Sequence, residues 1–548
     1  MSFFKKLFFA FTGKERIAFL ACSAIAVASF AIVMSMVVAQ ATVSVPTQGG
    51  TYTEGMVGQP EYVNPVTAQS EADLSLVKLV YANLTDLADD ITTSTDGRTW
   101  TVHLKNGLTW QDGQKLTSDD VIFTVQSIQA ADANSPLYTS WEGVTASRVS
   151  ELEVQFTLAN PYAFFGDDLD DLYIIPKHIF ADVPPGNWYL SDYNLKPVGS
   201  GPYEFTAYDE QDDGFISGYH LTAWSGYAGR QPLIQNFNVQ FFRNEADLVA
   251  SFNAGQVDGF GNLSAGDLAE ISRPYNLFAW RTPGYYAIFW NESKNIALQD
   301  PAVRQALSEA VDRDALVSQA LAGYGAADDG PIPPDAPYFV PTGESSSPDL
   351  ASETLSQDGW TISSSSPFRS KTIQKTSVPL AVNLTVPDIN FLVTTAGILQ
   401  GAWQSIGVQV NIATDTPADL VANAIKNRAY ESLLFGNVLG PSSDLYSFWD
   451  SSQRFSPGLN LAIYQNKAVD SLIEAARQEL DDASRTQEFA AAEQDIVNDD
   501  PAVFLYSPDY LYISSRDVQG VATGTLVDPS DLSREMTGWY LDTARVLK

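Results

Sequence analysis

The stretch that decides the fold is residues 284–323, GYYAIFWNESKNIALQDPAVRQALSEAVDRDALVSQALAG. Its aromatic and aliphatic start, Tyr285 to Trp290, predicts a strand that is buried on both faces. Asp300 followed by Pro301 predicts a helix start, because aspartate accepts from a free N–H and proline presets φ. Apolar residues then recur at helical spacing until Gly323, where we expect the helix to stop. A strand, a loop and a helix in this order are typical of an α/β protein.

A second informative stretch is residues 96–121, DGRTWTVHLKNGLTWQDGQKLTSDDV. Its Asp-Gly and Asn-Gly pairs predict tight turns, and the alternating residues between them predict a β-hairpin. Thr117 or Ser118 is expected to cap a following helix. Asp119 and Asp120 fit the negative charges favoured at a helix N-terminus better than they fit catalytic groups.

These two stretches together resemble the family 5 solute-binding proteins, the oligopeptide- and dipeptide-binding components of ABC importers. The residues that carry the resemblance are the Asp-Gly and Leu-Thr-x-Asp-Asp-Val motif near 112–121, and Asn291 with Asp-Pro-x-Val-Arg-x-Ala-Leu and Ala-x-Asp-Arg after it. The Gly-Ser-Gly-Pro-Tyr turn at 199–203 also matches. The resemblance covers residues 49–515 and is weakest at 342–378, where many serines predict a flexible insert or linker.

The resemblance implies an α/β fold of the periplasmic-binding-protein type (class II, venus flytrap), with two lobes and an extra small lobe. One N-terminal transmembrane helix is expected to precede this body. Lobe I is expected to combine residues 49–80, 185–280 and 505–548. Residues 81–184 are expected to form the extra lobe II, and residues 281–504 lobe III.

The N-terminal end has the pattern of a membrane anchor. Residues 1–16 form a basic tail, and residues 17–39 are an uncharged run long enough to cross a bilayer. The positive charge before this run predicts a cytoplasmic N-terminus, residues 40–48 as a tether and the bulk of the chain on the extracytoplasmic side. Two cleavage sites compete with an uncleaved anchor: a weak lipoprotein box at Cys22, and a signal-peptidase site ending at Ala41. The length of the apolar run favours the uncleaved anchor.

Composition excludes several classes of function. The formal net charge of −35 argues against nucleic acid as a partner, because phosphates would be repelled. One cysteine and three histidines leave no disulfide within the chain and no familiar zinc motif. Four aspartates between 167 and 171 lack the spacing of a calcium loop and predict a solvated loop. We therefore expect no metal and no cofactor.

The function implied by the resemblance is capture of a peptide or similar small polar solute between two lobes. The loaded protein, a monomer, would deliver it to an ABC permease and its ATPase. The same fold used as a sensor or scaffold is an alternative that the sequence does not separate. An envelope-anchored peptide-processing enzyme would need a nucleophile–base pair or a metal site, and the sequence shows neither pattern.

The resemblance also implies a set of ligand contacts in the first turn, the central strand and a loop near 440: Asn64, Tyr286, Phe289, Asn291, Gly436, Asn437, Asp444 and Trp449. Peptide binders of the family commonly pair the peptide's α-amino group with an aspartate in that loop, but here the position falls near Leu439 or Gly440. Either Asp444 takes over this role, or the ligand has no free amine there. The simpler interpretation of Asp444 is a cap for a helix at 445–449.

Overall fold

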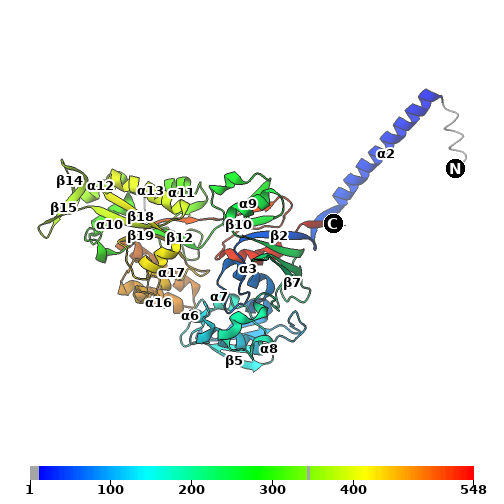
Figure 1. Ribbon diagram of the computed structural model, residues 1–548, viewed down its shortest axis with the longest axis horizontal. Coiled ribbons are helices and arrows are strands. Elements are labelled where there is room, and N and C mark those ends of the chain that lie inside the picture. Colours follow the sequence, from blue (N-terminus) through cyan, green and yellow to red (C-terminus); the bar gives the residue numbers. More distant parts are fainter. Residues whose placement is uncertain (1–11, 342–345, 548) are drawn as a thin grey trace.

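The computed structural model describes residues 12–341 and 346–547 (Figure 1). One helix, α2 (Gly13–Ala41), projects away from the body, and within the described residues its segment Gly13–Met36 is long and apolar enough to cross a membrane. Strand β1 (Thr42–Thr47) follows and pairs antiparallel with β22 (Asp542–Leu547) near the C-terminus. The predicted tether is therefore not a free linker, because the C-terminal strand supplies its backbone hydrogen bonds.

Lobe I is built on a seven-stranded sheet in the order β11-β21-β10-β2-β9-β8-β7. Its three neighbours β10, β2 and β9 run parallel. Helices α3 (Glu71–Val80) and α18 (Leu532–Glu535) pack on each other beside this sheet. The strands are β2 (Gly49–Val57), β7 (Tyr203–Glu210), β8 (Ile216–Ala223), β9 (Ile234–Phe242), β10 (Gly259–Gly261), β11 (Tyr275–Trp280) and β21 (Tyr510–Ser515), and α9 (Glu245–Asn253) follows β9.

Lobe II contains a four-stranded sheet in the order β3-β4-β6-β5. The strand predicted between the Asp-Gly and Asn-Gly turns is confirmed as β4 (Thr99–Leu104). The predicted hairpin with the residues after the Asn-Gly turn is wrong, because β4 pairs with β3 across the Asp96–Gly97 turn and with β6. Thr109 and Lys115 form only one isolated bridge. The predicted helix cap is confirmed, since Thr117 and Asp120 form a capping box. The elements are α4 (Leu84–Leu87), β3 (Ala88–Thr93), β4 (Thr99–Leu104), α5 (Ser118–Ile128), α6 (Tyr138–Trp141), β5 (Thr145–Ser150), β6 (Glu153–Thr157), α7 (Phe165–Asp170) and α8 (Lys177–Phe180).

Lobe III is built on a six-stranded sheet in the order β13-β20-β12-β19-β17-β18. The predicted buried strand is confirmed as β12 (Gly284–Trp290), and Asp300 caps α10 (Pro301–Glu309) as expected. A single helix reaching Gly323 is wrong, because the Asp312 carboxylate accepts from the backbone N–H of Ala315 and starts a second helix, α11 (Arg313–Ala320). The other elements are β13 (Gly325–Ala327), β17 (Ala381–Pro387), α13 (Asn390–Ser405), β18 (Gln409–Asp415), α14 (Pro417–Leu420), β19 (Ser432–Val438), α15 (Tyr446–Trp449), α16 (Lys467–Gln478), α17 (Asp482–Asp499) and β20 (Ala502–Pro508).

The serine-rich stretch is mostly ordered structure of lobe III rather than a linker. Its residues 342–345 lie outside the described residues, and the remainder forms a helix and three short strands. Two of its serines, Ser352 and Ser356, accept hydrogen bonds from the buried Arg369 guanidinium. Composition alone therefore misled here. The elements are α12 (Pro348–Gln357), β14 (Thr361–Ser363), β15 (Ser366–Ile373) and β16 (Thr376–Pro379).

Candidate ligand-binding site

The chain crosses between lobes I and III twice, and the two crossovers lie side by side. Residues 281–283 join β11 to β12, and Asp509 joins β20 to β21. The second crossover therefore lies at Asp509 rather than at the predicted boundary of 505, because β20 continues in the lobe III sheet through Pro508. Arg281 Nη1 lies 2.7 Å from Asp509 Oδ1, and Thr282 donates to the carbonyl of Pro508 at 2.9 Å. These contacts tie the two crossovers into one hinge.

Each lobe presents the carboxyl ends of its parallel strands to this hinge. In lobe I, β21 begins at the hinge and pairs antiparallel with β10, so β10 ends at the hinge. Strand β2 runs parallel to β10 and therefore ends there too. In lobe III, Val438 at the end of β19 pairs with Gly284, the first residue after the hinge, and β17 runs parallel to β19. Ligands of open α/β sheets bind outside the carboxyl ends of the strands. The space between the two lobes is therefore the candidate ligand-binding site.

Three aromatic rings pack together near the hinge end of the lobe III sheet, a group we call the aromatic wall; Tyr506 is fully buried, whereas Tyr286 and Phe391 are partly exposed. Tyr286 is half-buried, and its ring packs against Phe391 at the start of α13 and Tyr506 in β20, with ring centroids 5.2 Å and 5.8 Å apart. Gly436 pairs with Tyr286 across the β12–β19 ladder, and a Cβ on it would lie 2.9 Å from the tyrosine ring. Glycine at this position therefore lets the ring lie against the neighbouring strand. Tyr286 and Gly436 are the predicted contacts that the structure brings together at the hinge-facing edge.

Three other predicted contacts lie in the core on the opposite face of the same strands. Asn437 and Trp449 both donate to the buried Tyr285 hydroxyl, at 2.9 Å and 3.1 Å. Phe289 packs against Trp449, with ring centroids 6.3 Å apart. Side chains alternate between the faces of a strand, so Tyr285 and Phe289 point away from the side that Tyr286 occupies. These three predicted contacts serve the core of lobe III instead.

The two remaining asparagines hold turns. Asn64 is fully buried, and its side-chain oxygen accepts from the backbone N–H of Val66 at 3.0 Å. Asn291 lies at the far end of β12 from the hinge, where its amide donates to the carbonyl of Arg428 at 3.0 Å. Both were predicted as ligand contacts, but the Asn64 side-chain oxygen and the Asn291 amide serve local backbone geometry, and the Asn64 side-chain nitrogen is buried without a hydrogen-bond partner among the described residues.

Asp444 has two partners within lobe III. Its Oδ1 accepts from the backbone N–H of Tyr446, the first residue of α15, at 3.0 Å, although Leu445 rather than Asp444 holds the N-cap position of this helix. Its Oδ2 accepts from Arg477 Nε at 2.9 Å, an ion pair that no sequence pattern indicated. The Arg477 guanidinium also lies over the Tyr446 ring, 4.2 Å from its centroid. Both oxygens of Asp444 are therefore engaged by the protein itself.

Lobe II contacts lobe III beside this ion pair. The backbone N–H of Ala163 donates to the carbonyl of Arg477 at 2.8 Å, and the Ser442 hydroxyl donates to the Asp167 carboxylate. Phe164 of lobe II is buried against Phe489 of lobe III, with ring centroids 6.1 Å apart. The segment that leads into α7 thus joins the two lobes.

The predicted solvated loop of aspartates is wrong, because these residues form α7 and its end. Burial, together with the neighbouring carboxylate of Asp167, raises the pKa of Asp168 to about 8, so Asp168 is largely protonated at pH 7. Asp170 pairs instead with Arg534 at 2.7 Å. Among the described residues, no group of three acids, histidines or cysteines is arranged to hold a metal ion.

The comparisons with known proteins agree with this architecture. Residues 84–456 match the family described as bacterial extracellular solute-binding proteins, family 5 (middle). The chain belongs to this family. It is 27% identical over 500 residues to the oligopeptide-binding protein AppA of Bacillus subtilis, which covers 87% of this chain and 89% of AppA. It is 24% identical over 529 residues to the dipeptide-binding protein of Escherichia coli, covering 89% and 94%.

Solved structures give the same result. The substrate-binding protein CtaP of an ABC transporter from Listeria monocytogenes superposes with a TM-score of 0.78 at 25% identity, covering 90% of this chain and all of CtaP. AppA of Bacillus subtilis, solved with a nonapeptide, gives a TM-score of 0.70 at 26% identity and covers 91% of this chain and all of AppA. Membership of this family identifies the protein as a solute-binding protein.

Two residues of the aromatic wall were not predicted from the sequence. Phe391 and Tyr506 come from α13 and β20, both more than 100 residues after Tyr286 in the chain, and only the fold brings them together.

Proposed function

We propose that this protein captures a peptide or similar small polar solute between lobes I and III and delivers it to an ABC permease driven by an ATPase. The observation that carries the proposal is that the carboxyl ends of parallel strands in both lobes lie at the hinge, with the aromatic wall beside those of lobe III. Aromatic walls with a few polar groups are typical of small-ligand sites. Capture by hinge closure requires no catalytic group, and the protein would act as a monomer.

The proposed contact set keeps Tyr286 and Gly436 of the eight predicted residues and adds Phe391. Tyr286 and Phe391 would stack on apolar parts of the ligand. The other six have side chains engaged within the protein, including Asp444 with its partner Arg477. The ligand's α-amino group therefore has no unengaged aspartate in the loop at 437–445.

The first test of this proposal uses matched free and N-acetylated peptides. Because Asp444 is already paired with Arg477, blocking the peptide's N-terminus is expected to change the affinity by less than tenfold, about 1.4 kcal/mol. Isothermal titration calorimetry with each pair of peptides measures this difference. A strong preference for the free amine that disappears in Asp444→Asn would show that Asp444 leaves Arg477 to bind the ligand.

We also propose that the N-terminal helix remains attached as a single-pass anchor with the body outside the cell. The apolar helix Gly13–Met36 and the basic residues before it support this, as does the weak match at Cys22 to a lipoprotein box. Intact-mass analysis of protein purified from the membrane is expected to find the N-terminal residues present. A mature start near Ala41, or a lipid on Cys22, would contradict the anchor.

A further inference from the structure

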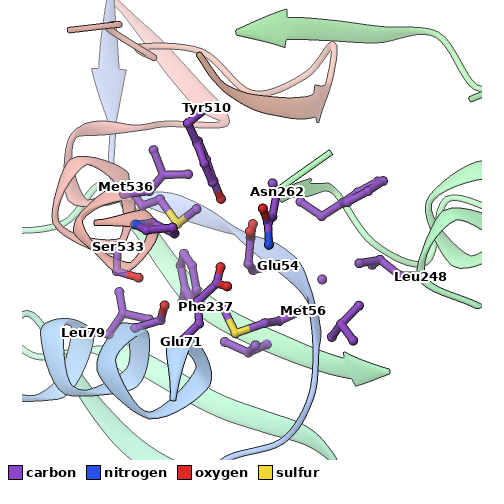
Figure 2. Close-up of a pocket in the computed structure, with 18 of the residues that line it drawn as sticks. Glu54, Met56, Glu71, Leu79, Phe237, Leu248, Asn262, Tyr510, Ser533 and Met536 are labelled. Carbon is purple, nitrogen blue, oxygen red and sulfur yellow. The ribbon is translucent and has the colours of Figure 1, made fainter. Parts of the chain in front are cut away.

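A cavity of about 340 Å³ lies in lobe I beside α3 and α18 (Figure 2). Val57 and Asn262 line it, and both are solvent-exposed at the hinge-facing ends of β2 and β10. Tyr510, the first residue of lobe I after the second crossover, forms another part of its wall. The mouth of the cavity therefore lies at the edge of lobe I that faces lobe III.

A buried carboxylate points into this cavity. Glu54 of β2 is 6% exposed, and its Oε2 accepts from the hydroxyls of Tyr52 at 2.8 Å and Tyr512 at 2.5 Å. Its Oε1 has no hydrogen bond to any described residue, and Figure 2 shows the carboxylate among the cavity-lining side chains beside Asn262. A Cβ at Gly259 would lie within 2.4 Å of both tyrosine hydroxyl oxygens, so the neighbouring strand needs glycine there. The carboxylate is thus held by one oxygen and offers the other to the cavity.

Among the described residues that line the cavity around Glu54, none carries a positive charge. The pKa of Glu54 is raised to about 8: burial is the largest cause, the hydroxyls of Tyr512 and Tyr52 oppose it, and the carboxylates of Glu71 and Asp258 add to it. Glu71 of α3 also lines the cavity, and burial raises its pKa too. A buried and a half-buried acid that face one cavity without a positive partner are unfavourable as charged groups. A bound cation would remove that cost.

The remaining walls decide which kind of cation fits. They are largely apolar, and the larger side chains are Met56, Leu79, Leu248, Phe260 and Met536. No group of metal-binding residues occurs among the described residues, so a bare metal ion would lack ligands. A cation with an aliphatic chain would instead place its charge on the carboxylates and its methylene groups on these walls.

We propose that this cavity binds an alkylammonium group, with Glu54 and Glu71 as its anions. The group would come either from a lysine-like side chain of the captured peptide or from a free aliphatic amine. Binding of a peptide's lysine-like side chain rests on the proposed function, whereas binding of a free aliphatic amine does not. Since Glu54 gives up a proton when it pairs with a cation, binding is expected to strengthen from pH 6 to pH 8 and to release protons below pH 8.

The test uses the full-length protein at pH 8 and two N-acetylated tripeptides whose central residue is lysine or norleucine. We expect the lysine peptide to bind at least tenfold more tightly, and this preference to fall below threefold in Glu54→Gln. Glutamine keeps an oxygen for the two tyrosine hydroxyls, so the variant is expected to fold. Glu245→Gln, which removes an exposed acid at the rim of the same cavity, is the matched control and should keep the preference.

Calorimetry of the unmodified protein at pH 7 in two buffers of different ionisation enthalpy is the second readout. It should detect proton release with the lysine peptide and none with the norleucine peptide. Equal affinities for the two peptides, or a lysine preference that survives Glu54→Gln, would overturn the proposal. If neither peptide binds, the proposed function fails, and titration with pentylamine decides the cavity alone: binding that Glu54→Gln abolishes supports the site, and no binding overturns it.

Discussion

Replacing Trp449 with alanine is expected to lower the free energy of unfolding of lobe III by about 3–5 kcal/mol. The indole is fully buried, packs between Phe289 and Phe504, and donates to the Tyr285 hydroxyl at 3.1 Å. Truncation would therefore leave a cavity and remove a hydrogen bond from a buried hydroxyl. Denaturant titration of the variant beside the unmodified protein measures the change.

Tyr286→Ala is the matched control for Trp449, because its ring is also aromatic but only half-buried. It should cost less stability than Trp449→Ala and should weaken peptide binding directly. A Trp449→Ala protein of unchanged stability that no longer binds peptide would show that Trp449 is a ligand contact after all.

Replacing Arg369 with methionine is expected to cost at least about 3 kcal/mol of unfolding free energy. The guanidinium is 5% exposed and donates to the carbonyls of Ile406 at 2.6 Å and Trp360 at 2.7 Å. It also donates to the hydroxyls of Ser352 and Ser356. Methionine would fill much of the same volume but leave these buried acceptors without a donor.

Thermal and denaturant unfolding of Arg369→Met measure this cost. Lys375→Met, at an exposed position in the same group of short strands, removes a similar charge and should change stability by less than about 0.5 kcal/mol. Equal effects of the two substitutions would show that the serine-rich stretch is the loose insert that its composition predicts.

Local patterns in the sequence were sufficient for the elements that depend on near neighbours. The aromatic run predicted strand β12, and the Asp300–Pro301 pair predicted the start of α10, because both depend on residues close together in the sequence. The end of α10 was missed, because Asp312 caps a new helix within a pattern that continues without interruption. The pairing of β4 with β6, about 50 residues away, depends on long-range contacts that a local hairpin pattern does not contain.

The candidate site was harder to predict than the fold for the same reason. A continuous apolar strand does not show which of its faces lies toward the ligand, so Tyr286 and Phe289 were predicted together although they point to opposite faces. Glu54 was not singled out, because Tyr512, which holds its carboxylate together with the neighbouring Tyr52, comes from a distant part of the chain.

The central claim, reversible capture of a solute at the hinge, is tested most directly by calorimetric titration of the full-length protein with N-acetylated peptides, followed by mass spectrometry of the recovered peptide. We predict saturable binding of one peptide per chain and recovery of the peptide unchanged. Tyr286→Ala should weaken this binding about thirtyfold, or about 2 kcal/mol. Cleavage of the peptide that a point substitution abolishes, or affinity that is unchanged in Tyr286→Ala, would contradict the account.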